Sequence, residues 1–379
     1  MLTSIEPLKG YVGATVTVVA ENLGTIAKED IQMMFGETPA TDITIVDEST
    51  FTVKVPSLTT FGEIPLSMTI HGVEMNMGGY AAFEILASPV ITSVETDNKF
   101  SSKAVQVGNT VTIKGTGFRN STISSATFGG QDLNYTVVSD TEITASVSEQ
   151  CAEGEDVITF KFDDVVVDVV SSDKLNMLKA GSDISDYILT NVKQPFESKE
   201  GKTSGHCTPV GWKFNYGAGN DGFCHNESEI EMPGEGLYMN DQGGLLVIQS
   251  GWEGRSKKMN GKMFQIFNIP QGIYDVVIDV AELATSGGGR KKAGLFISKG
   301  GEEQTPNMDA SGNWTENTNL LKSVDFYKLG ETYNENYKDR RFVIENLTID
   351  YEGETTLGFA VHFDSNRALK ISSIKVLLK

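Results

Sequence analysis

Cysteine and histidine, which build disulfide frameworks and most metal sites, are scarce in this sequence. The 379 residues include three cysteines and four histidines. An odd number of cysteines leaves at least one thiol without an internal partner, so cysteine usage says little about the cellular compartment. Neither zinc-finger spacing nor a His-Glu-x-x-His helix occurs. The sequence therefore offers no standard metal motif.

Positive charge is also in short supply. There are 31 Lys and Arg residues against 51 Asp and Glu residues, which gives a formal net charge of −20. A chain this acidic repels nucleic acid phosphates and anionic lipid headgroups, so we expect no nucleic acid partner. The charge suits a protein that handles neutral ligands, and it also fits a simple role in solubility.

Long apolar runs are missing. No stretch approaches the roughly 20 apolar residues of a membrane span, and no basic segment followed by an apolar one comes after Met1. Two interpretations are open: a cytoplasmic protein, or an exported protein whose signal was removed ahead of residue 1. We favour export, because of the resemblance described below.

Catalytic signatures are absent as well. The sequence has no Gly-x-Ser-x-Gly elbow and no phosphate-binding P-loop. Paired carboxylates could hydrolyse glycosides, but no pair stands out among 51 acidic residues. We therefore predict that the protein is not an enzyme, with a glycoside hydrolase kept as an alternative.

What the sequence does contain is β-structure that repeats. Glycine is abundant, with 39 residues, and apolar and polar residues alternate along segments such as 15–20 and 110–114. Three pairs of segments match in the same order, at similar offsets: 13–18 with 108–113, 34–36 with 127–129, and 52–55 with 144–147. The pattern indicates two copies of one unit of about 90 residues, the size of a small β-sandwich.

Each copy resembles an IPT/TIG domain, an immunoglobulin-like sandwich. The second copy carries the family pattern well: Pro89-Val90-Ile91, Gly108, Gly115-Thr116-Gly117-Phe118, Phe128-Gly129 and Ser139-Asp140-Thr141. The first copy departs at the turn, where Asn22 stands in Ala20-Glu21-Asn22-Leu23 and can adopt the left-handed conformation of a glycine. The resemblance implies domains at 1–87 and 88–178, and we predict no ligand site in either.

The third region has a different composition. All three tryptophans lie beyond residue 180, after the polar linker 179–183. Apolar patterns predict strands at 245–249, 263–268, 274–280, 341–344, 356–361 and 371–377. The order of short motifs resembles galactose-binding-like jelly rolls: Thr190-Asn191, Phe196-Glu197, Gly211-Trp212, Gln265, Pro270-Gln271-Gly272-Ile273-Tyr274 and the closing strand 371–376. The expected fold is therefore all-β, with a jelly-roll domain over 179–379.

This architecture resembles the surface glycan-binding lipoproteins of Sus-like polysaccharide-utilisation systems. The resemblance implies a monomeric, non-catalytic protein, exported to the cell surface as an outer-membrane lipoprotein, with a lipid anchor ahead of Met1. The third domain would bind a polysaccharide or oligosaccharide, and the two sandwiches would act as a spacer. A structural or adhesive protein that binds another protein is the alternative from a different class.

Candidate ligand-binding residues come from aromatic residues in polar segments. Sugars stack their C–H faces on aromatic rings and bond their hydroxyls to planar polar groups. We predict Trp252 and Trp314 as stacking platforms, with Asn240, Asp241 and Arg255 as hydrogen-bonding neighbours. Trp212 and Tyr274 start strands and are predicted to lie in the core.

The pairs His206-Cys207 and Cys224-His225 leave three interpretations open. We favour a Cys207–Cys224 disulfide with Cys151 unpaired, while free buried thiols and a zinc site remain alternatives. Galactose-binding-like domains commonly hold a structural calcium ion, but the sequence lacks an Asp-x-Asp-x-Asp loop. No calcium ligands are therefore assigned, and no other cofactor is expected.

Overall fold

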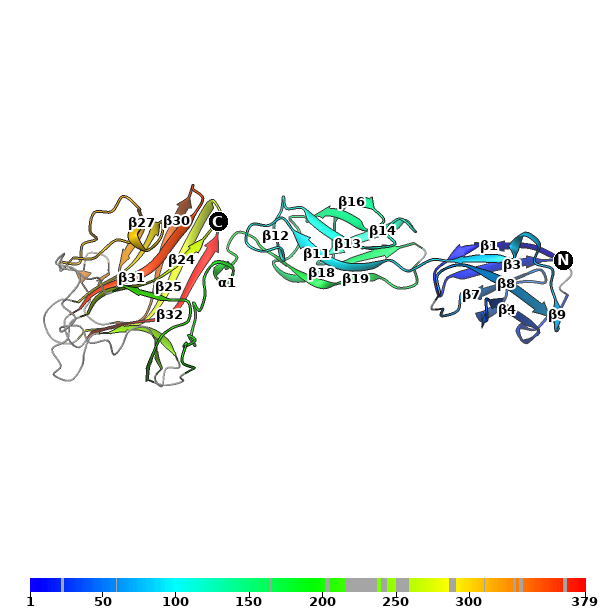
Figure 1. Ribbon diagram of the computed structural model, residues 1–379, viewed down its shortest axis with the longest axis horizontal. Coiled ribbons are helices and arrows are strands. Elements are labelled where there is room, and N and C mark those ends of the chain that lie inside the picture. The colour runs from blue at the N-terminus through cyan, green and yellow to red at the C-terminus, as the bar shows by residue number, and fades with distance from the viewer. Residues whose placement is uncertain are drawn as a thin grey trace. The chain divides into compact units, whose positions relative to one another are not determined.

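The regular secondary structure of the described residues is almost all β-strand, as predicted. The chain forms two compact units, Met1–Leu178 and Lys179–Lys379, and some of their strands are labelled in Figure 1. The computed structural model describes residues 1–21, 24–58, 60–163, 165–201, 205–215, 237–239, 244–249, 259–285, 291–309, 311–329, 332–333, 337–363 and 367–379.

The first sandwich pairs a sheet ordered β1-β3-β7-β6 with a sheet ordered β2-β10-β8-β4-β5, to which β9 adds on β8. Alternate residues such as Val16, Val18 and Phe51 are fully buried between the sheets, as strand periodicity requires. The elements are β1 (Leu2–Glu6), β2 (Lys9–Gly10), β3 (Thr15–Ala20), η1 (Lys28–Asp30), β4 (Ile31–Phe35), β5 (Thr38–Pro39), β6 (Thr41–Ile45), β7 (Thr50–Lys54), β8 (Gly62–Ile70), β9 (Val73–Glu74), η2 (Gly78–Tyr80) and β10 (Ala82–Ile85).

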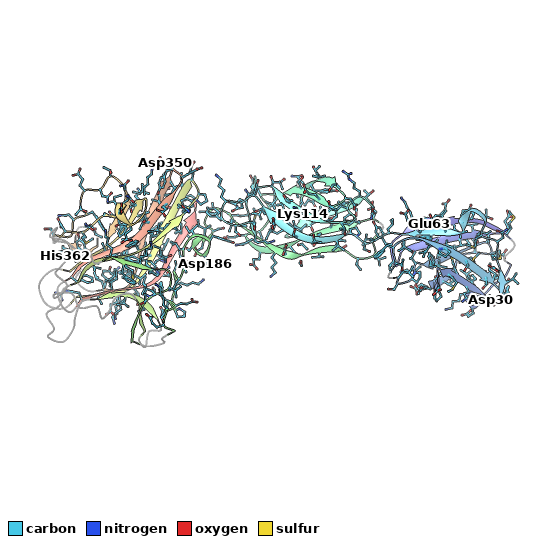
Figure 2. The ribbon with its side chains drawn as sticks, in the orientation of Figure 1. Asp30, Glu63, Lys114, Asp186, Asp350 and His362 are labelled. Atoms are coloured by element: carbon cyan, nitrogen blue, oxygen red, sulfur yellow. The ribbon has the colours of Figure 1, made fainter. Side chains whose placement is uncertain are left out.

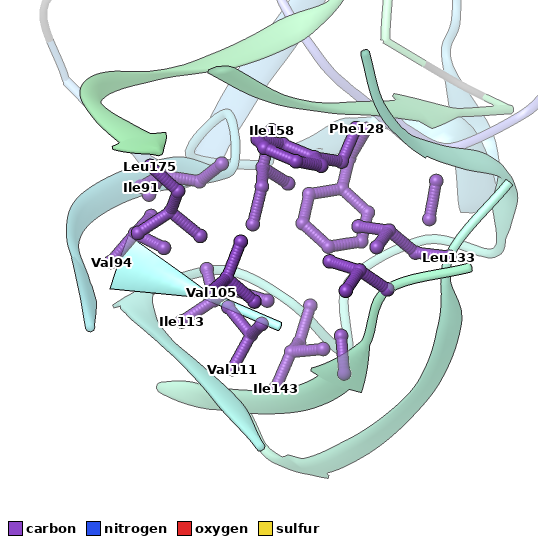
Figure 3. Close-up of a cluster of buried hydrophobic side chains, with 14 of the residues drawn as sticks. Ile91, Val94, Val105, Val111, Ile113, Phe128, Leu133, Ile143, Ile158 and Leu175 are labelled. Atoms are coloured by element: carbon purple, nitrogen blue, oxygen red, sulfur yellow. The ribbon is translucent and has the colours of Figure 1, made fainter. Parts of the chain in front are cut away.

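The second sandwich repeats this topology, with sheets ordered β11-β13-β17-β16 and β12-β19-β18-β14-β15. Its buried side chains from both sheets form one cluster, in which Phe128 lies opposite Ile143 and Val111 (Figure 3). The strands are β11 (Val90–Thr96), β12 (Ala104–Val105), β13 (Val111–Thr116), β14 (Ile123–Phe128), β15 (Gln131–Asp132), β16 (Asn134–Ser139), β17 (Glu142–Ser146), β18 (Gly154–Phe162) and β19 (Val169–Met177).

The third domain packs two antiparallel sheets, ordered β20-β22-β23-β32-β25-β30 and β21-β24-β31-β26-β27, and adds a hairpin of β28 and β29. All six segments predicted as strands lie within strands. The elements are α1 (Ser185–Ile188), β20 (Gly205–Cys207), β21 (Lys213–Asn215), β22 (Leu237–Met239), β23 (Leu245–Gln249), β24 (Met259–Asn268), β25 (Gly272–Thr285), β26 (Lys291–Lys299), η3 (Glu302–Gln304), β27 (Leu320–Asp325), β28 (Lys328–Leu329), β29 (Thr332–Tyr333), β30 (Tyr337–Ile349), β31 (Glu354–Phe363) and β32 (Arg367–Leu378).

Between these two sheets lie the aromatic residues predicted to be in the core. Trp212 is 2% exposed, and its ring stacks on Phe359 at 5.8 Å between ring centroids. The Trp212 indole N–H donates to the carbonyl of Asn191 at 3.1 Å. Tyr274 is buried and donates to the carbonyl of Pro270 at 2.7 Å, and burial raises the pKa of its hydroxyl to about 12.

Strand pairing places the ends of several strands, and so the segments that join them, at one end of the third domain, which we call the loop end. There Met259 pairs with Phe363, which also pairs with Lys291, while Arg367 pairs with Thr285. In Figure 2, His362 marks the loop end and Asp350, in the turn between β30 and β31, marks the opposite end.

Candidate functional site

Residues 305–309 and 311–317, which we call the strap, pack on the outer face of the five-stranded sheet over β24, β31 and β26. The buried Lys262 ammonium group of β24 donates to the hydroxyl oxygen of Thr305 at 2.6 Å. Further along, Met308 is fully buried and packs with Phe264 and Phe296 on the sheet. The strap therefore occupies this face of the sheet, and an extended ligand cannot lie flat on the strands beneath it.

Trp314 belongs to the strap and is held against β26 and β27. Its ring meets Phe296 edge-on, at 6.0 Å between centroids and an interplanar angle of 69°. Its indole N–H donates to a carboxylate oxygen of Asp325 at 3.1 Å. Beneath the ring lies Gly294, where a Cβ atom would sit 2.7 Å from the Cζ2 atom of Trp314. The ring is half-buried, so it is both a packing residue and part of the surface.

Beside Trp314, the turn of the strap is tied to β26 and to the chain after β27. The ammonium group of Lys292 lies 4.1 Å from the centroid of the Tyr327 ring, which is cation–π geometry. The Tyr327 hydroxyl donates to the carbonyl of Gly312 at 2.8 Å. A Cβ atom at Gly312, whose φ is +83°, would collide with both of these side chains.

Asp309 closes the same turn. Its carboxylate accepts hydrogen bonds from the backbone amides of Ser311 at 2.8 Å and Asn313 at 2.9 Å. Burial works to raise the pKa of the Asp309 carboxyl, but the bonds from Asn313 and Ser311 together outweigh it and lower the pKa. The turn is therefore ordered by its own hydrogen bonds and carries an ionised carboxylate at neutral pH.

Trp314 lies toward the loop end. Gly294, under its ring, is three residues into β26, about 10 Å from Lys291 at the start of that strand. Lys291 of β26 and Met259 of β24 both pair with Phe363 of β31, which lies between them. Met259 directly follows the segment that contains Trp252 and Arg255. Met259, which follows that segment, and Trp314 therefore lie toward the same end of the domain.

Several predicted residues lie outside the described residues: Trp252, Asn240, Asp241, Arg255 and Cys224. The segment 240–243 joins β22 to β23 at Gly244, whereas the segment that contains Trp252 begins after Gln249. These two anchor points are separated by the length of β23, about 17 Å. Strand pairing alone therefore does not bring the two predicted parts of the site together.

Of the three cysteines, the structure describes the side chain of Cys151 but not those of Cys207 and Cys224. Cys151 is buried in the second sandwich, makes no disulfide, and its thiol points at the carbonyl of Phe128 at 3.6 Å. The backbone of Cys207 lies in β20, but its side chain falls outside the described part. The Cys207–Cys224 pairing therefore stays a prediction.

The outer face of the six-stranded sheet has a different character. Along β25, β30 and β32 it carries paired charges and no aromatic side chain. Asp279 of β25 accepts two bonds from Arg341, at 2.7 and 3.0 Å, and one from the Ser373 hydroxyl at 2.7 Å. These three strands consequently offer no ring on which a sugar could stack.

Among the described residues, no group of three or more His, Cys, Asp or Glu side chains is arranged to hold a metal ion. None of the helices within the described ranges is long and apolar enough to span a membrane.

Sequence reasoning missed the residues that surround Trp314. Asp325, Gly294 and Lys292 lie in ordinary strand sequence, and no motif singles them out. Asp325 follows Trp314 by only 11 residues, but the contact depends on β27 pairing with β26 beneath the strap. The sequence pattern does not predict the pairing of β26 with β27, so it could not identify these three residues.

Comparison with known proteins identifies the first two domains. Residues 1–84 and 89–173 each match the IPT/TIG domain family. Among curated proteins, none matches this chain.

Several solved structures are similar to the chain at low identity. The extracellular region of plexin A4 is 14% identical, with 56% of this chain and 19% of that chain covered, at a TM-score of 0.31. SGBP-B of the mixed-linkage glucan utilization locus of Bacteroides ovatus is 13% identical, with 97% and 73% covered, at a TM-score of 0.21. SGBP-B from a complex xyloglucan utilization locus in Bacteroides uniformis is 13% identical, with 100% and 99% covered, at a TM-score of 0.24.

The family match coincides with the two structural copies. The sheets of residues 1–84 and 89–173 have the same strand order. The two sandwiches are therefore the two regions that match the IPT/TIG domain family.

Proposed function

We propose that the third domain binds a glycan without catalysing a reaction on it, and that the two IPT/TIG domains act as a spacer. The observation that carries the proposal is Trp314, a half-buried indole held by contacts to β26 and β27 near the loop end. Sugar rings stack on such fixed aromatic surfaces through their C–H faces. A rigid ring also loses little conformational freedom when it binds.

The surroundings support a site at the loop end over a site on the sheet faces. The strap covers the outer face of the five-stranded sheet, and the outer face along β25, β30 and β32 holds paired charges. We propose that Trp252 supplies a second platform and that Arg255 bonds to sugar hydroxyls there. Asn240 and Asp241, whose segment is anchored about 17 Å away at Gly244, are proposed to bond to hydroxyls further along the glycan. The sequence resemblance adds export to the cell surface and a lipid anchor to this proposal.

The test is to make Trp252→Ala and Trp314→Ala separately and to measure retention on polysaccharide gels together with the melting temperature. Loss of one stacking platform should weaken binding by about 1–3 kcal/mol, roughly tenfold to a hundredfold. Trp314→Phe belongs beside Trp314→Ala, because it keeps an aromatic ring over Gly294 and so limits the loss of packing.

The matched control is Phe61→Ala, which removes an aromatic ring that is 55% exposed in the first sandwich. This variant should be retained on the gel as well as the unmodified protein is. Full retention of both tryptophan variants on every glycan that retains the unmodified protein would refute the proposed site.

A further inference from the structure

Three contacts fix the orientation of Trp314. The missing side chain of Gly294 leaves the space in which the ring sits, because a Cβ atom there would lie 2.7 Å from Cζ2. Phe296 meets the ring edge-on. The bond from the indole N–H to Asp325 then selects one rotation of the ring among those that the space allows.

Asp325 itself is well anchored. It is the last residue of β27 and lies opposite Gly294 in the ladder between β26 and β27. The next residue, Phe326, donates its backbone amide to the carbonyl of Ala293 at 2.8 Å, and its ring is fully buried. The backbone of Asp325 and of the residue after it is therefore paired with β26, which fixes the position of the acceptor carboxylate.

We propose that Asp325 is a positioning residue for glycan binding: its carboxylate holds the indole of Trp314 in the orientation that stacks a sugar ring. This inference rests on the proposed function. Asp325 acts through Trp314 and is not proposed to touch the glycan. A bond from an N–H to a carboxylate is stronger than a neutral hydrogen bond, so it can keep a half-exposed ring from rotating.

The experiment compares three substitutions in the full chain by the dissociation constant for one retained polysaccharide. Asp325→Ala removes the acceptor and should weaken binding about fivefold to tenfold, as expected for a lost hydrogen bond. Asp325→Asn keeps an acceptor oxygen at the same place and should bind within about twofold of the unmodified protein. Asp325→Glu keeps the charge but moves the carboxylate by one methylene group, and should weaken binding as Asp325→Ala does.

The control is Glu316→Ala, which removes an exposed carboxylate two residues from Trp314 and should leave affinity unchanged. A second readout is the indole N–H resonance of Trp314, identified among the three tryptophans by its loss in Trp314→Phe. This resonance should shift and exchange faster with water in Asp325→Ala and Asp325→Glu, and it should be preserved in Asp325→Asn.

The possible outcomes distinguish the positioning role of Asp325 from the proposed glycan-binding function. If the unmodified protein binds and Asp325→Ala and Asp325→Glu bind equally well, the positioning role is refuted while the proposed function stands. If the unmodified protein is not retained on any glycan, the proposed function fails, and the positioning role for glycan binding fails with it. Weakened binding by Asp325→Glu with an unchanged melting temperature would support the positioning role even if Asp325→Ala folds poorly.

Discussion

Residues on the outer face of the six-stranded sheet show how charge is arranged in this acidic chain. Carboxylates of β25, which lies between β30 and β32, pair with basic residues: Asp275 with Lys379, which follows β32, Asp279 with Arg341, and Glu282 with Lys338 and Lys370. The hydrogen bond from Arg341 lowers the pKa of Asp279, and the bond from Lys379 lowers the pKa of Asp275. Both groups are therefore better accommodated as carboxylates in the folded protein than in the unfolded chain.

Asp279→Asn should lower the stability of the third domain by about 1 kcal/mol at pH 7, since it removes a partly exposed ion pair. The folded pKa of Asp279 lies below the ordinary value of 3.8, so this contribution is present above that value. It is lost as the pH falls through the folded pKa, because both states then bind the proton. Urea unfolding followed by tryptophan fluorescence should therefore show a penalty that shrinks in acid.

The tryptophan signal reports this domain alone, because all three tryptophans lie beyond residue 180. Glu352→Gln, in the exposed turn after β30, serves as the control and should have little effect at either pH. A penalty for Asp279→Asn that keeps its full size well below the ordinary carboxyl pKa would contradict the role given to the ion pair.

At the residue scale, patterns predicted buried positions better than surface positions. Trp212, which comes directly before β21, and Tyr274, which lies near the start of β25, are both in the core as expected. The polar neighbours of Trp314 favour an exposed ring, and in the structure the ring is half-buried. The neighbours Asn313 and Thr315 are exposed while Trp314 turns toward the sheet, as alternation in an extended segment dictates. Polar flanks in such a segment are thus compatible with a packed residue between them.

At the scale of elements, the Gly-x-Gly-Phe motif of the second sandwich has a direct packing explanation. A Cβ atom at Gly115 would overlap the carbonyl oxygen of Val90 on the paired strand and the ring of Phe118, which is 1% exposed. Gly117 adopts a φ of +77°, which a side chain disfavours. The motif therefore lets the chain turn back and bury Phe118 against its own strand.

We expect Gly115→Ala to destabilise the second sandwich by about 2–3 kcal/mol, because backbone and a buried ring must both move. Scanning calorimetry is the suitable measurement, since the first 178 residues contain no tryptophan. Gly79→Ala is the control, because a Cβ atom there meets nothing within 4 Å and its φ is not in the left-handed region. Equal melting of the two variants would show that the motif tolerates a side chain at Gly115.

The repeat could be predicted from sequence because each matched segment is a strand or a turn with its own local pattern. The strap could not, because its burial depends on room in a sheet formed by distant strands. At Gly294 of β26, for example, a Cβ atom would lie 2.7 Å from Cζ2 of Trp314 and 3.2 Å from Cε of Met308, both of which belong to the strap. Small residues on neighbouring strands make the space that the strap fills, and strand periodicity alone does not reveal which face they share.

At the scale of the whole molecule, charge is divided unevenly. Residues 1–178 contain 9 basic and 24 acidic residues, a formal charge of −15, whereas residues 179–379 contain 22 and 27, a charge of −5. The excess negative charge thus belongs to the two IPT/TIG domains, and the aromatic residues proposed to bind glycan belong to the less charged part. Stacking on a neutral sugar needs no net charge, so this division fits a spacer and a binding domain with separate tasks.

The whole-molecule prediction follows from this division and from the two compact units of the fold. Residues 179–379 expressed alone should bind the polysaccharide that retains the full chain, with a dissociation constant within about twofold of the full chain's. Residues 1–178 should fold, as judged by a cooperative calorimetric transition, and should not be retained on the same gel. The physical reason is that each unit has its own buried core, while every tryptophan lies in the second unit. Retention of residues 1–178, or a loss of more than about tenfold by a folded 179–379 fragment, would show that the sandwiches contribute to binding and are not only a spacer.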